Sequence, residues 1–136
     1  MSAWGPAVAE RKRAPARAGK RAAARAGAGR GPEIRVVLTT VPDAEVGARL
    51  ARTLVEERLA ACVNLVPGVQ SFYRWQGELE EAAELLLVVK TCADRSAALA
   101  ARIQALHPYA LPEVLELAVS GGSTAYLDWL QRESST

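Results

Sequence analysis

The segment HPYALPEVLEL, from His107 to Leu117, contains the residues best suited to metal chemistry. His107 is the only histidine among 136 residues, and Glu113 follows six positions later, beyond Pro112. A neutral imidazole suits Cu(II) and Zn(II), and a carboxylate can add an oxygen ligand, although a chain-derived site needs about three or four donors. A lone histidine more often ends a helix and hydrogen-bonds a nearby carbonyl. Both interpretations of His107 stay open.

Three aromatic residues and one lysine could line a small-molecule pocket or a subunit interface. Trp75, Tyr73 and Tyr109 each combine an apolar ring with one polar edge, which favours interfaces. Interface packing is preferred for Trp75, whereas both roles remain open for Tyr109. Lys90 ends an apolar strand. We expect it to pair with Glu113 or Glu116, with anion binding as the alternative.

The sequence offers no set of residues for enzymatic catalysis, so we expect a protein that is not an enzyme. No serine or cysteine has an evident base beside it, because the only histidine lies in a proline-bounded turn. The SGGST stretch could receive an anion at Ser123, but it is not a Gly-rich phosphate loop. Cys62 and Cys92 form no CxxC pair and are typical of buried thiols in a reducing compartment, which predicts a cytoplasmic location.

Charge divides the chain into two unlike parts. Residues 1–32 carry eight basic groups against one acid, whereas residues 33–136 carry nine basic and fourteen acidic groups. The first part is rich in Ala, Arg and Gly and poor in large apolar side chains, which predicts a disordered basic tail. A solvated tail is favoured over an arm for nucleic acid or anionic lipid and over a transit peptide, so nucleic acid is not expected as a partner. No apolar run is long enough to span a bilayer.

The periodicity from residue 33 onward predicts alternating strands and helices. A strand over 34–41 precedes a helix that starts after Asp43. Two strands, 61–75 and 78–91, form a long hairpin with a bulge at Pro67-Gly68 and a turn at Gln76-Gly77. A helix over 94–107, capped by Asp94 or Ser96, leads to a strand over 112–120. Ser123 then caps a terminal helix.

This β-α-β-β-α-β order predicts an α+β ferredoxin-like sandwich, in which two helices cover one face of an antiparallel sheet. The other face is left uncovered, and an exposed apolar surface of this kind usually marks an interface. We therefore expect a homo-oligomer whose sheets face inward. The apolar hairpin residues expected to need this cover are Val69, Phe72, Tyr73, Trp75, Leu85, Leu87 and Val89.

Several motifs resemble the CutA family of divalent-cation tolerance proteins. They are RLAACVNLVPGVQSFYRWQGELE, LLVVKT, HPYALPEVLELAV and YLDWL, and together they cover about residues 34–132. The resemblance implies a ferredoxin-like subunit with an extra C-terminal helix, a tight homotrimer, an architecture related to the PII signalling proteins, and a link to copper and other divalent cations. It also implies that His107 and Glu113 occupy positions linked to copper binding. Some members have a cysteine at the position of Thr39, and a threonine there disfavours Cu(I). Thr39 is expected, with the aromatic residues and Lys90, at the inter-subunit cleft or interface.

Three functions follow from these patterns and the resemblance. The first is a non-enzymatic homotrimer that binds divalent cations such as Cu(II) in metal tolerance. The second is a PII-like sensor that binds a small molecule or anion in a cleft between subunits lined by Tyr109, Lys90 and Glu113. The third is a structural module whose main property is a stable trimer.

Overall fold

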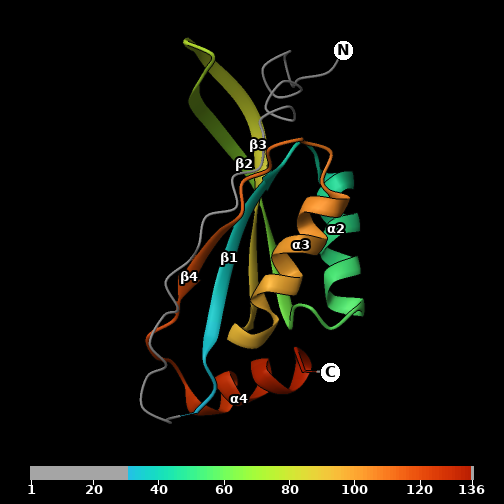
Figure 1. Ribbon diagram of the computed structural model, residues 1–136, viewed down its shortest axis with the longest axis vertical. Helices are drawn as coiled ribbons and strands as arrows, with labels where there is room; N and C mark the ends of the chain where they lie inside the picture. The colour runs from blue at the N-terminus through green and yellow to red at the C-terminus, as the bar shows by residue number, and fades with distance from the viewer. Residues whose placement is uncertain (1–30, 136) are drawn as a thin grey trace.

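The computed structural model describes residues 31–135 and contains one four-stranded antiparallel sheet with helices on one face (Figure 1). The predicted basic tail falls almost wholly outside these residues. The elements, in chain order, are β1 (Ile34–Val41), α2 (Ala44–Glu56), β2 (Cys62–Trp75), β3 (Glu78–Cys92), a 3-10 turn (Ala93–Arg95), α3 (Ser96–Leu106), β4 (Leu115–Ala118) and α4 (Thr124–Glu133). The strand order β2-β3-β1-β4 is that of a ferredoxin-like sandwich, which confirms the predicted fold class.

The hairpin of β2 and β3 has the predicted length, turn and bulge. Gln76 and Gly77 form a two-residue loop in which both residues have positive φ, 49° and 83°, as a turn matched to the strand twist requires. The pairing register shifts between Val66 and Val69, on either side of Pro67-Gly68. A proline cannot donate a hydrogen bond to the ladder, so the irregularity lies at the predicted bulge. Beyond this bulge the hairpin extends past the ends of α2 and α3 (Figure 1).

The core lies between the sheet and the two helices α2 and α3. Strand residues of one parity, such as Val37 and Val89, are buried against Leu54 and Ile103 of the helices. Asp43 caps α2 by accepting a hydrogen bond from the Val46 amide at 2.8 Å. Gly47 lets α2 approach the sheet closely, because an added Cβ would lie 2.8 Å from Leu65 Cδ1. The central apolar residues of both helices, Leu50, Leu54, Leu99 and Ile103, therefore face the sheet.

The exposed ion pair between Glu57 and Arg102 links the end of α2 to α3. Arg102 donates from Nε and Nη2 to the two carboxylate oxygens at 2.8 and 2.7 Å. This hydrogen bonding lowers the pKa of Glu57 below its usual value. A lowered folded-state pKa means that the contribution is present above the unfolded pKa and is lost as the pH falls through the folded value. Both side chains are solvated, so the contribution to stability is small.

Three sequence-based details were wrong. Helix α3 begins at Ser96, and neither Asp94 nor Ser96 caps it; the Ser96 hydroxyl instead donates to the Ala93 carbonyl at 2.9 Å. Strand β4 covers only four of the nine residues predicted, since Pro112 cannot join a ladder and β4 pairs with Arg35–Leu38 alone. Some apolar hairpin residues were assigned to the uncovered face, but they lie under the helices, because alternate residues of a strand point to opposite faces. These residues are Leu85, Leu87 and Val89. Phe72 was also assigned to the uncovered face, but it pairs with Glu81 and so has the parity of the helix side, beyond the helices, where it is exposed.

The terminal helix α4 packs across the end of the sheet that lies opposite the hairpin tip (Figure 1). Its Leu130 is buried with Ile34 and Cys92 in a second, smaller core. The Ser123 hydroxyl accepts from the Tyr126 amide at 3.4 Å, so the predicted cap is confirmed.

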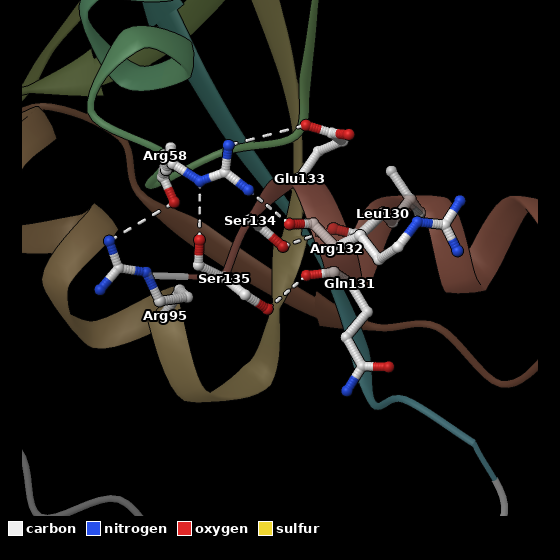
Figure 2. Close-up of polar contacts among 8 residues, drawn as sticks. All are labelled: Arg58, Arg95, Leu130, Gln131, Arg132, Glu133, Ser134 and Ser135. Atoms are coloured by element: carbon white, nitrogen blue, oxygen red, sulfur yellow. Dashed lines mark hydrogen bonds and ion pairs between the residues drawn. The ribbon is translucent and has the colours of Figure 1, made fainter.

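Arg58, in the turn between α2 and β2, holds the C-terminal end of α4 (Figure 2). Its Nε donates to the Ser135 carbonyl at 2.7 Å and its Nη2 to the Arg132 carbonyl at 2.6 Å. These carbonyls have no partner inside the helix, and a cation also complements the negative end of the helix dipole. Arg58 itself has a φ of 57°, so the backbone accepts some strain at the residue that fixes α4.

Candidate functional site

The sheet face opposite α2 and α3, here called the open face, is apolar over the β1, β3 and β4 strands. The strand register places Leu117 beside Val36 and Leu115 beside Leu38, all pointing away from the helices. Leu115 and Leu117 are 54% and 50% exposed. The six residues at the centre of the open face are Val36, Leu38, Leu86, Val88, Leu115 and Leu117. A contiguous apolar area at the centre of an uncovered sheet face is typical of a surface that another chain covers.

His107 lies at the edge of this region and is buried, with 7% of its surface exposed. Its Nε2 lies 2.8 Å from the Thr40 carbonyl oxygen, and its Nδ1 accepts the Tyr109 amide hydrogen at 3.1 Å. Since a carbonyl can only accept, the neutral ring carries its proton on Nε2. The histidine thus ties the α3–β4 connection to the end of β1. This is the helix-ending role that the sequence left open, and it uses the lone pair that a metal would need.

Tyr109 continues this polar chain into the hairpin. Its hydroxyl donates to Glu84 Oε2 at 2.8 Å, and its ring lies 4.5 Å from the His107 ring, centroid to centroid. Glu84 is only 3% exposed, and its position in β3 points its side chain to the open face. Sequence reasoning missed Glu84. Its alternation with Ala82 and Leu86 could have identified it, because these three side chains point to one face of the sheet and Glu84 is the only carboxylate among them.

Tyr109→Phe is expected to destabilise the protein by about 1–3 kcal/mol, because a buried carboxyl group loses a hydrogen-bond donor that water cannot replace. Denaturant unfolding at one fixed protein concentration measures this difference. Tyr126→Phe is the matched control. Its hydroxyl lies on an exposed residue, 3.4 Å from Lys90 Nζ, so its removal should change stability by less than about 0.5 kcal/mol. Equal effects of the two substitutions would contradict the structural role of the Tyr109–Glu84 contact.

The side chains that the structure describes in a single subunit do not fit a resident metal ion. Among residues 31–135, no three or more His, Cys, Asp or Glu side chains are grouped so that they could hold one. Glu113 is half-buried in the connection between α3 and β4. Thr39 is completely buried on the helix side of β1, so it lines neither the open face nor a cleft at the surface. The roles of His107 and Glu113 as metal ligands remain predictions.

Lys90 lies on the open face near α4, where its Nζ is 3.4 Å from the Tyr126 hydroxyl and 5.8 Å from the centre of the Tyr126 ring. The expected pairing with Glu113 or Glu116 was wrong, since Glu116 points to the other face and lies 3.8 Å from Arg35 Nε. Lys90 is six residues along β3 from Glu84, a separation of roughly 20 Å. Lys90 and Tyr109 therefore cannot line one cleft within a subunit.

Tyr73 and Trp75 lie on the hairpin, on the strand parity of the open face, and both are half-buried. Tyr73 packs against Ala82 and Tyr109, which places it beside the polar chain of His107, Tyr109 and Glu84. Trp75 is further out, opposite Glu78. Their predicted interface or pocket role stays a prediction, but the structure brings Tyr73 and Tyr109 together.

Comparison with known proteins identifies the family. Residues 35–133 match the model of the CutA1 divalent ion tolerance proteins. The chain belongs to this family. The CutA divalent-cation tolerance protein of Thermus thermophilus is 54% identical over 99 residues, which are 73% of this chain and 96% of that protein. The chloroplastic CutA protein of Arabidopsis thaliana is 44% identical over 73% of this chain, but the match spans only 54% of its length.

Solved CutA structures share the fold described above. The structure of the Thermus thermophilus divalent cation tolerance protein superposes with a TM-score of 0.74 at 53% identity, covering 75% of this chain and 99% of that one. Several CutA relatives carry the name divalent-cation tolerance protein. Within residues 31–135, no helix has the length and apolar character needed to cross a membrane.

Proposed function

We propose that this CutA protein acts in divalent-cation tolerance as a non-enzymatic homotrimer. The observation that carries the proposal is the open face, because Leu115 and Leu117 remain half exposed in the subunit. Facing three such sheets inward would remove this apolar area from water, at a gain of about 25 cal/mol per Å² buried. A cytoplasmic location is consistent with the unpaired thiols of Cys62 and Cys92.

The proposed cation site involves Glu113 and His107, completed by donors from a second subunit. A single subunit lacks a set of three donors among its described residues. Copper(II) is the preferred ion, because imidazole nitrogen and carboxylate oxygen are borderline and hard ligands and no thiol stands at Thr39. An ion at His107 Nδ1 must displace the Tyr109 amide, which lies 3.1 Å away. We therefore expect modest affinity and reversible binding, which suit tolerance better than permanent storage.

Isothermal titration of the metal-free full chain with Cu(II) tests this site. Glu113→Gln and His107→Ala are each expected to weaken binding by about tenfold or more, as removal of one ligand does at a site with few donors. Glu45→Gln, which alters an exposed carboxylate on α2, is the matched control and should bind like wild type. Circular dichroism of each variant establishes that it is folded.

Identical Cu(II) titrations of wild type and of the two site variants would contradict the assignment of the cation to His107 and Glu113. Zn(II) titrated in parallel shows whether the preference for Cu(II) is real. Sedimentation equilibrium of the same samples tests the trimer separately, so a failure of the metal site does not obscure the oligomeric state.

A further inference from the structure

The open face has an acidic end and a basic end. On β3, every second residue points to this face, and the charged members of that series are Glu78, Glu80, Glu84 and Lys90. Glu84 is buried beneath Tyr109. Among the described strands, Lys90 is the only cation on the open face, since Arg35 and Arg74 have the opposite parity. Glu78 and Glu80 thus stand at the hairpin tip, and Lys90 stands beside α4.

These opposite charges cannot meet within one subunit. Ten residues separate Glu80 from Lys90 along β3, which corresponds to roughly 33 Å of extended strand. Figure 1 shows the hairpin tip and α4 at opposite ends of the molecule. Within residues 31–135, neither Glu78 nor Glu80 forms an ion pair, and the Lys90 ammonium group interacts only with the Tyr126 hydroxyl and ring.

We propose that Lys90 of each subunit lies against Glu78 and Glu80 of the next subunit, so that the hairpin tip of one copy docks beside α4 of its neighbour. This inference rests on the proposed homotrimer and specifies how its copies are oriented. A ring with threefold symmetry uses two different patches on every subunit, which must complement each other. The two charged ends of the open face meet that requirement, and the apolar centre described above lies between them.

Because these charged side chains are partly buried, they favour one orientation of neighbouring subunits over the others. Glu80 and Lys90 are both half-buried before any partner is present. A further loss of water on assembly would penalise each charge unless an opposite charge lies close to it. An orientation that placed the acidic ends together would bring at least two carboxylates per subunit into one region, and such like-charge contacts oppose association. Tyr126 adds an aromatic ring that holds the Lys90 ammonium at this edge of the face.

Charge reversal of the full chain tests the proposed contact. Lys90→Glu alone, and Glu78→Lys with Glu80→Lys, are each expected to weaken trimer association by about tenfold or more. The three substitutions combined restore opposite charges and should recover most of the wild-type association. Arg52→Glu on the exposed side of α2 makes the same change of charge outside the open face and should have no effect. Sedimentation velocity over a range of protein concentrations measures all five proteins.

The outcomes separate this inference from the homotrimer itself. A monomeric wild type would overturn the proposed trimer. Two results with a trimeric wild type would overturn only the Lys90 contact. In one, association survives both Lys90→Glu and the paired Glu78→Lys and Glu80→Lys change. In the other, the variant with all three substitutions associates no better than those two variants. The Glu78 and Glu80 changes lie on the hairpin beyond the core, so this variant gives an answer even if Lys90→Glu fails to fold.

Discussion

Leu115→Glu combined with Leu117→Glu is expected to convert the protein into folded monomers. Both leucines lie on β4, on the open face, and remain half exposed in the subunit, so neither substitution creates a cavity in the core. In the trimer, each subunit would instead bury two carboxylates without partners. The cost of burying such groups predicts a trimer dissociation constant raised by roughly 100-fold or more.

Sedimentation equilibrium at micromolar concentration measures the loss of the trimer, and circular dichroism establishes that the monomer retains its secondary structure. Val55→Glu is the control, because Val55 is also apolar and exposed but lies on α2, away from the open face. A double variant that remains as trimeric as wild type would show that the open face is not the subunit interface.

Leu54→Ala is expected to reduce the free energy of unfolding by about 2–5 kcal/mol, the range observed when a leucine in a well-packed core is truncated. Leu54 has no exposed surface, and it lies in the cluster formed by α2, α3 and the sheet. Its carbonyl also accepts the amides of Leu59 and Ala60, at 3.0 and 3.1 Å, where the chain leaves α2. Any shift of the helix end into the cavity would strain these bonds.

The neighbouring residue provides the control for this substitution. Val55→Ala removes methyl groups from an exposed side chain and is expected to change stability by less than about 0.5 kcal/mol. Chemical denaturation of both variants must use one protein concentration, because the apparent stability of an oligomer depends on it. Similar losses in the two variants would contradict the assignment of Leu54 to the core.

The fold was predictable because its strongest signals are local. Gln76-Gly77 predicted a hairpin turn and Pro67-Gly68 a bulge, and both occur where backbone geometry admits few other residues. The strand over 34–41 was found with its observed limits, because a β-branched run ends at Pro42. These signals outweighed the helix-forming composition of ELEEAAELLL, since pairing with β2 decides the conformation of that segment.

The errors arose where tertiary contacts, and not local sequence patterns, decide the structure. Periodicity indicates that Leu86 and Leu87 point to opposite faces, but not which face the helices cover. Leu85, Leu87 and Val89 were therefore assigned to the wrong face, whereas Tyr73 and Trp75 have the parity of the open face. Strand β4 was predicted too long, because its length depends on where β1 offers free ladder positions. The cap predicted for α3 failed because a 3-10 turn precedes the helix and the Ser96 side chain bonds backward.

The candidate site was predictable only in part. The sequence singled out His107 and Tyr109, which the structure brings into contact, but it did not find Thr40 or Glu84, their partners on β1 and β3. These contacts join residues 25 and 67 positions apart, so no local pattern encodes them. Lys90 shows the same limit: its observed partner, Tyr126, lies on a helix 36 residues later.

The central place of β1 in the sheet has a consequence for synthesis on the ribosome. Strand β1 is made first, but one of its two neighbours, β4, comes about 75 residues later, and Ile34 is covered only when α4 supplies Leu130. At roughly 5–20 residues per second, this strand waits several seconds with one edge unpaired. Closure of the sheet must therefore wait for β4 and α4, which makes the segment from Leu115 to Glu133 the part whose docking commits the subunit to its native state.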